Sequence, residues 1–180
     1  NLHDNVGNLL ASAVGYLQLK TPQITTSNEL IVEAMNEIRF LSHNLVKDDD
    51  APLLTKLDLL VSRFNDFSSV NFRIGDFSEG KINQLDAITQ QNIYMITQEL
   101  FANIIKHAKA TEASIQVFGR EEGVLQFIIE DDGIGFSTHA EGTGIGLKNA
   151  FKRAEISKLK LSIDSSPQGT NYIIETPKIK

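Results

Sequence analysis

Residues 125–147 read LQFIIEDDGIGFSTHAEGTGIGL, and this stretch decides how the second half of the chain folds. The apolar run from Leu125 to Ile129 ends at Asp131-Asp132 and the turn Gly133-Ile134-Gly135, and GTGIGL at 142–147 then opens a helical pattern. Five of the 12 glycines fall in this stretch, so its backbone must turn sharply or approach something closely. The stretch therefore predicts a strand that delivers a carboxylate to a glycine-rich binding loop.

The two glycine clusters suit different parts of a nucleotide. Asp131, at the end of a strand, can accept a hydrogen bond from an exocyclic amine. The second cluster presents bare N–H groups and a helix N-terminus to an anion, through Gly142, Gly144, Gly146 and Leu147. A dinucleotide fingerprint would need Gly at position 147, and a P-loop would need Gly-Lys-Ser/Thr. Neither fits, and two unrelated glycine turns remain the structural alternative.

A polar face precedes this loop on a predicted long helix. Its members are spaced by three or four residues and project from one side: Glu99, Asn103, Lys106 and His107. Positions on the opposite side are apolar, so the helix can bury that side. An amide oxygen and a carboxylate are ligands that Mg²⁺ takes readily while it bridges phosphates. The alternative is an ordinary solvated helix face.

Apolar periodicity and turn residues predict the elements around the loop. Helices are expected at 52–67, 86–109 and 146–156, and strands at 71–76, 113–120, 124–130, 160–164 and 171–175. Helices followed by adjacent strands indicate an α+β fold with a mixed sheet packed on helices.

The first 47 residues carry a different pattern. Apolar residues at steps of three and four predict one helix over 2–20, and the capping-box pattern from Thr26 to Glu29 predicts the start of a second that runs to about residue 45. A helical hairpin buries one stripe poorly, so we expect two hairpins to pair as a four-helix bundle in a dimer. The acidic run 48–50 reads as a linker, which gives domains 1–47 and 48–180.

Composition excludes several classes of protein. The chain of 180 residues is 41% hydrophobic, so a packed core is expected. It has no cysteine, which removes disulfides and thiolate zinc sites, and its net charge of −6 argues against a direct nucleic-acid partner. It lacks an initiator Met and opens inside a helical pattern, so we expect a cytoplasmic fragment whose preceding part has room for a sensor or an inner-membrane anchor.

The run from Gln98 to Ala108 resembles the N box of the sensor histidine kinases, which belong to the GHKL-type ATPases. Residues 131–135 resemble their first glycine box and 142–147 their second. The resemblance implies an ATP site in an α/β sandwich, with Asn103 and Glu99 at Mg²⁺, and with Lys106 and His107 near the phosphates. It also implies that Asp131 accepts from the adenine amine and that Thr170 lies at the adenine end.

The short segment between the glycine boxes, 137–141, resembles the subfamily whose acceptor motif reads H-D-x-x-x-Q. Residues 3–8 read HDNVGN, so the resemblance assigns His3 as phosphoryl acceptor and Asp4 as its neighbouring base. Asn8 stands where the motif has Gln. In the family, this amide is assigned to positioning a water that removes phosphate from the partner protein, and the Asn side chain reaches less far than Gln. The sequence therefore leaves the balance between kinase and phosphatase activity undetermined.

The resemblance as a whole implies a histidine autokinase of a two-component system. Its 1–47 hairpin would dimerise, His3 would receive the γ-phosphoryl group of ATP, and an aspartate of a response-regulator receiver domain would receive it next. Two alternatives remain: another GHKL-type protein such as a serine kinase or switch, and a signalling scaffold that acts mainly as a phosphatase.

Overall fold

The computed structural model describes residues 2–19, 21, 23–28, 30–31, 34, 51–120, 123–136 and 145–178, and the side chains of 2–6 and 145 lie outside the described set. The chain forms two compact units, residues 1–49 and 50–180.

The second unit is built on a five-stranded sheet with the strand order β1-β2-β3-β5-β4. The strands span Asn71–Phe77 (β1), Glu112–Gly119 (β2), Leu125–Asp131 (β3), Lys160–Ser166 (β4) and Gly169–Glu175 (β5). β1 and β2 run parallel, and the other neighbouring pairs are antiparallel. The prediction of an α+β fold with a mixed sheet is confirmed.

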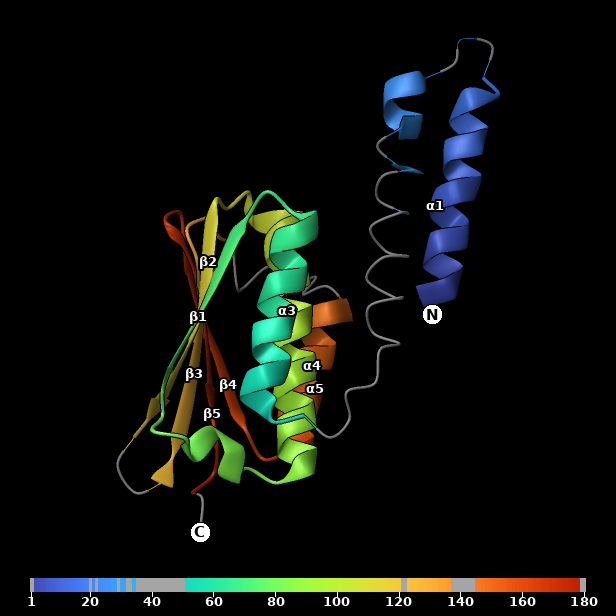
Figure 1. Ribbon diagram of the computed structural model, residues 1–180. Helices are drawn as coiled ribbons and strands as arrows, with labels where there is room; N and C mark the ends of the chain where they lie inside the picture. Colours follow the sequence, from blue (N-terminus) through green and yellow to red (C-terminus); the bar gives the residue numbers. More distant parts are fainter. Residues whose placement is uncertain are drawn as a thin grey trace. The chain divides into compact units, whose positions relative to one another are not determined.

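Three helices cover one face of this sheet (Figure 1): α3 (Leu53–Phe67), α4 (Ala87–Asn103) and α5 (Ile145–Ile156). Asp86 begins α4, because its Oδ1 accepts from the Thr89 N–H group at 3.0 Å and its Oδ2 from the Thr89 hydroxyl at 2.6 Å. These bonds hold the pKa of Asp86 below its usual value. A short 3₁₀ helix, η1 (Lys81–Gln84), which the sequence did not predict, connects β1 to α4.

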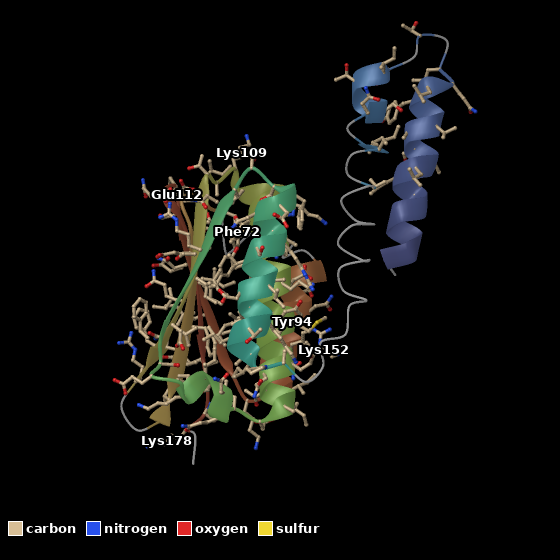
Figure 2. All side chains as sticks on the ribbon, in the orientation of Figure 1. Phe72, Tyr94, Lys109, Glu112, Lys152 and Lys178 are labelled. Atoms are coloured by element: carbon tan, nitrogen blue, oxygen red, sulfur yellow. The ribbon has the colours of Figure 1, made fainter. Side chains whose placement is uncertain are left out.

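The core lies between the sheet and the helices. Phe64 of α3, Phe72 of β1 and Phe101 of α4 form an aromatic cluster with ring centroids 4.5–5.5 Å apart. Figure 2 shows Phe72 in the layer between the sheet and the helices. Side chains of β2 and β3 alternate between buried and half-buried positions, as expected of strands with one covered face.

The first unit contains α1 (Leu2–Leu17) and helical residues at 24–28, 30, 31 and 34. The prediction that Thr26 caps the second helix is wrong. Ser27 N already donates to Gln23 O at 3.0 Å, so the first turn forms before Thr26. The Ser27 hydroxyl donates to Ala13 O of α1 at 2.9 Å in a buried contact, which ties this turn to α1.

The described helices belong to one chain, so the four-helix bundle stays a prediction. No helix among the described residues is long and apolar enough to cross a membrane.

Candidate functional site

Asp131 ends β3 with a buried and incompletely bonded carboxylate. The residue is 8% exposed. Its Oδ1 accepts from the Gly133 N–H group at 2.9 Å, whereas its Oδ2 is buried and has no hydrogen-bond partner of good geometry among the described residues. The Thr170 N–H group is near enough to the carboxyl to favour its ionised form. Burial is the main cause that raises the pKa of this carboxyl above its usual value. Because a buried acceptor without a donor is costly, Oδ2 can accept a hydrogen bond from a donor beyond the described residues, such as a ligand amine.

The neighbouring Asp132 is used by the fold. Its Oδ1 accepts from the N–H groups of Thr111 at 2.7 Å and Glu112 at 2.9 Å, and its Oδ2 accepts from the Thr111 hydroxyl at 2.5 Å. The bond to the Thr111 side chain is the main cause that lowers the pKa of Asp132. Of the two adjacent carboxylates, Asp132 therefore ties the glycine turn to the start of β2 with both of its oxygens, whereas Asp131 uses only Oδ1 for a hydrogen bond within the turn.

The glycine turn is also packed directly on the end of the long helix. Ile134 N donates to Ala108 O at 2.8 Å. A Cβ on Gly133 would collide with the same carbonyl oxygen, so the two backbones touch with no side chain between them. This close approach places Asp131 and the end of the helix at the same site.

The far end of the turn lies against the β4–β5 hairpin. Gly135 has a φ of 61°, and a Cβ there would collide with Ser166 O. Phe136 N donates to the Ser165 hydroxyl at 2.9 Å, and that hydroxyl lies 3.0 Å from the Thr170 hydroxyl. Thr170 is the strand partner of Asp131. The structure thus brings Thr170, Gly133 and Gly135 together around Asp131.

On α4, Glu99 and Asn103 lie one turn apart and are half-buried. The α-helix ends at Asn103 and not at 109 as predicted, because Ile104–Ala108 form a wider π turn (η2). Lys106 and His107 are exposed on this turn. A Cβ on Gly146 would collide with Oε1 of Glu99, so the start of α5 packs on the Glu99 carboxylate. Leu147 follows and is buried.

Several predicted site residues cannot be placed. Gly142 and Gly144 lie outside the described residues, as do the side chains of His3 and Asp4, whose backbone belongs to α1. Asn8 is exposed on α1, one turn after Asp4. Among the residues that the structure describes, no group of three or more His, Cys, Asp or Glu side chains could hold a metal ion.

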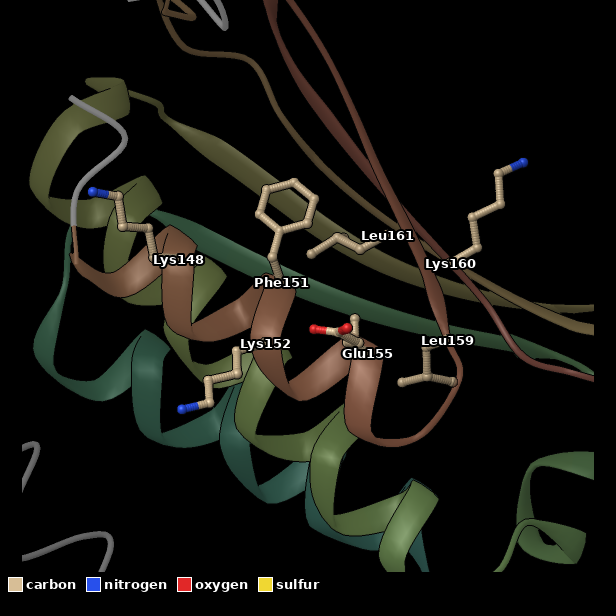
Figure 3. Close-up of a pocket in the computed structure, with 8 residues that line it drawn as sticks. Lys148, Phe151, Lys152, Glu155, Leu159, Lys160 and Leu161 are labelled. Atoms are coloured by element: carbon tan, nitrogen blue, oxygen red, sulfur yellow. The ribbon is translucent and has the colours of Figure 1, made fainter. Parts of the chain in front are cut away.

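A shallow hollow of about 610 Å³ lies elsewhere, between α5 and β4 (Figure 3). Phe151, Leu159 and Leu161 form its apolar part, and Lys148, Lys152 and Lys160 surround it. None of the predicted site residues lines it, so it is separate from the glycine turn.

The geometry around Asp131 fits a nucleotide. The unpartnered Oδ2 can accept from an exocyclic amine, and the amide and carboxylate oxygens of Asn103 and Glu99 are hard ligands suited to Mg²⁺ beside phosphates. Residues 88–180 match the family of histidine kinase-, DNA gyrase B- and HSP90-like ATPases. The chain belongs to this family. ATP is therefore its nucleotide.

Relatives of this ATPase are named sensor histidine kinases or sensor proteins. The sensor histidine kinase MctS of Rhizobium johnstonii is 31% identical over 157 residues, which cover 82% of this chain and 33% of that protein. The sensor protein VraS of Staphylococcus saprophyticus is 28% identical over 200 aligned residues, covering 98% of this chain and 53% of that protein. The chain thus spans between a third and about half of the length of these relatives.

Solved structures show the same fold for this ATPase. The Acinetobacter baumannii histidine kinase AdeS matches with a TM-score of 0.62 at 15% identity, covering 100% of this chain and 96% of that one. The blue-light activated histidine kinase of Erythrobacter litoralis matches with a TM-score of 0.61 at 15% identity, covering 98% and 57%.

Two contributions to the site had no sequence signal. Ser165 belongs to the run Ser-Ser-Pro-Gln-Gly, which indicates only a turn. The different uses of Asp131 and Asp132 depend on Thr111, which lies 21 positions before Asp132 in the connection to β2.

Proposed function

We propose that this chain is the catalytic region of a sensor histidine kinase, which transfers the γ-phosphoryl group of ATP to His3 and then to an aspartate of a response-regulator receiver domain. The family and the names of the relatives support this proposal. The observation that carries the ATP site is the buried Oδ2 of Asp131, which has no partner within the described chain.

In this proposal, Asp131 binds the base of ATP. Its ionised Oδ2 accepts from the adenine amine, while Oδ1 is held by the Gly133 N–H group. Thr170, the strand partner of Asp131, lies at the same end. The bare backbone of Gly133 and Gly135 keeps this turn close to the end of the long helix and to the β4–β5 hairpin, because Ala108 O and Ser166 O occupy the space of any Cβ there.

The phosphates would lie toward the end of α4. Asn103 and Glu99 are the proposed ligands of Mg²⁺ or its water, and Mg²⁺ would neutralise phosphate charge. Lys106 and His107 are exposed on the π turn and supply further donors to the phosphates. The second glycine box, Gly142 to Leu147, would contribute backbone N–H groups and the N-terminus of α5.

His3 is the proposed acceptor. A neutral imidazole nitrogen attacks the γ-phosphorus, the bond to the bridging oxygen breaks, and ADP leaves with that electron pair. Asp4 takes up the imidazole proton. Asn8, exposed one turn later on α1, is the residue we assign to positioning water in the reverse, dephosphorylating reaction.

Dimerisation through residues 1–47 is supported by an apolar stripe on α1. Leu10, Val14 and Leu17 recur at helical spacing and are 41%, 50% and 43% exposed in the single chain. A second hairpin would cover them. Because the reaction consumes ATP, we place this region in the cytoplasm.

The proposal is tested by incubating the chain with Mg²⁺ and ATP labelled at the γ-phosphate. We expect label that is stable in alkali and lost in acid, and that is absent from His3→Gln and from Asn103→Asp. His43→Gln is the matched control, because it removes the other histidine of the 1–47 region, and it should keep the label. Acid-stable label would favour a serine kinase and refute the proposal.

A further inference from the structure

The base end of the site is held by a residue that the proposed function does not use. Ser165 belongs to β4 and is half-buried, and its hydroxyl oxygen accepts from Phe136 N at 2.9 Å. The same oxygen lies 3.0 Å from the hydroxyl oxygen of Thr170 on β5. Ser165 therefore links Phe136, which follows the first glycine turn, to Thr170, which lies on the strand next to Asp131.

The hydrogen bonds restrict the Ser165 side chain. A backbone N–H group can only donate, so Phe136 takes one lone pair of the Ser165 oxygen. The bond between Ser165 and Thr170 then uses the second lone pair or the single hydrogen of that hydroxyl, depending on which oxygen donates. In either case the Ser165 hydroxyl links Phe136 N to the Thr170 hydroxyl, which the Tyr172 side chain also contacts.

The surrounding backbone is packed closely around Ser165. Beyond Ser166 O, a Cβ on Gly135 would also meet the Ser165 hydroxyl, at 2.8 Å. On the other side of the hairpin, a Cβ on Gly169 would collide with Asp131 O. The contacts of Gly135 with Ser166 O and of Gly169 with Asp131 O are between bare backbones, so they hold the hairpin at a close spacing from the glycine turn and from β3.

We propose that Ser165 is a positioning residue for the base of the nucleotide, which acts by holding the hydroxyl of Thr170 beside Asp131. This inference rests on the proposed ATP site. It concerns the base end alone, because Ser165 contacts neither α4 nor the π turn through any hydrogen bond of the described residues.

The test uses the full chain and measures the dissociation constants of ATP and ADP by calorimetry, together with KM and kcat of autophosphorylation. In Ser165→Ala, we expect ATP and ADP to bind about fivefold more weakly, by the same factor, since loss of one hydrogen bond has an effect of this order. KM for ATP should rise with that factor, and kcat should stay within about twofold. Ser162→Ala, an exposed position on the same strand, is the matched control and should bind as the wild type does.

Action through Thr170 is tested by a double-mutant cycle. Thr170→Val should weaken binding by a similar factor, and Ser165→Ala added to it should cause little further loss. Losses that multiply would overturn the proposal, and so would unchanged affinity in Ser165→Ala or unequal losses for ATP and ADP. If Ser165→Ala does not fold, Ser165→Cys keeps the volume with a weaker hydrogen-bonding group and should show about a threefold loss. A wild-type chain that binds no ATP would refute the proposed function instead.

Discussion

Replacing Asp131 by Asn tests whether its Oδ2 accepts a hydrogen bond from the adenine amine. The substitution keeps the size of the side chain, and the amide oxygen can still accept from Gly133 N as Oδ1 does. The amide nitrogen then takes the place of Oδ2. Where the wild type offers an acceptor to the adenine amine, the variant offers a second donor.

The magnitude follows from that exchange. A hydrogen bond to a charged acceptor is worth about 1.5–3 kcal/mol, which corresponds to a loss of roughly 10- to 150-fold in ATP affinity. The donor–donor contact adds to the loss, so we expect a value near the upper end. A guanine base carries a carbonyl oxygen where adenine carries the amine, so the preference for ATP over GTP should shrink in Asp131→Asn.

Although Asp131→Asn should bind ATP more weakly, its thermal stability without nucleotide should not fall. Burial raises the pKa of Asp131 in the folded state above its ordinary value of 3.8. The folded state therefore holds that proton more tightly than the unfolded state, and ionisation at neutral pH costs stability. Asn carries no charge, so the Tm of Asp131→Asn without ATP should be equal to or above that of the wild type.

Calorimetry with ATP and GTP, and thermal unfolding without nucleotide, give both quantities. Glu130→Gln is a matched control on the preceding residue, because the Glu130 side chain lies on the other face of the sheet and bonds Ser114 and Gln116. Unchanged ATP affinity in Asp131→Asn would refute the assignment of its Oδ2 to the base.

Three further substitutions test other parts of the account. Asp132→Ala removes the acceptor of three hydrogen bonds and should lower the free energy of unfolding by about 1 kcal/mol, a value discounted for the exposure of this side chain. Because the fold lowers the pKa of Asp132 from 3.8, denaturant titrations should show this difference from the wild type above pH 3.8 and lose it as the pH falls below that value. Gly146→Ala drives a Cβ into the Glu99 carboxylate and should reduce the rate of autophosphorylation by tenfold or more. In the control Gly119→Ala, the new Cβ meets only ordinary contacts, so the rate should not change. Equal rates in the two variants would contradict the packing of α5 on Glu99. Val14→Lys places a charge in the apolar stripe of α1 (Leu10, Val14 and Leu17) and should convert the dimer to a monomer, as measured by light scattering. Ser12→Lys, nearly opposite on α1, should leave the dimer intact. A dimeric Val14→Lys would show that the stripe is not the interface.

The sequence predicted the secondary structure of the second unit because its local signals agree. Alternating burial on β2 and β3, and the apolar positions Ile93, Ile96 and Leu100 on α4, correspond to periods of about two and about 3.6 residues. Thr26 was misassigned because a Thr followed three positions later by Glu occurs inside helices as well as at their starts. The structure begins that helix at residue 24, before Thr26, and Ser27 in its first turn contacts Ala13 of α1, a contact that no local pattern encodes.

The geometry of the site was less predictable from the sequence than the secondary structure was, because it depends on tertiary contacts. The glycine boxes indicated where a ligand approaches, but the tight spacing of Gly133 against Ala108 and of Gly146 against Glu99 is set by how α4 and α5 pack. Ile104 and Ala108 are four positions apart and both are buried, as helical spacing predicts, but that spacing does not distinguish the π turn after Asn103 from a continued α-helix. The role of Ser165 arises only when β4 and β5 pair and bring it to Phe136 and Thr170.

The most direct test of the central claim is to locate the phosphoryl group on the chain after incubation with Mg²⁺ and ATP. Fragmentation mass spectrometry of peptides prepared at neutral to alkaline pH preserves phosphohistidine and identifies the modified residue. The account predicts a single phosphoryl group on His3, whose formation requires an intact Asp131. A phosphoryl group on His43, on a serine or on a threonine would contradict it.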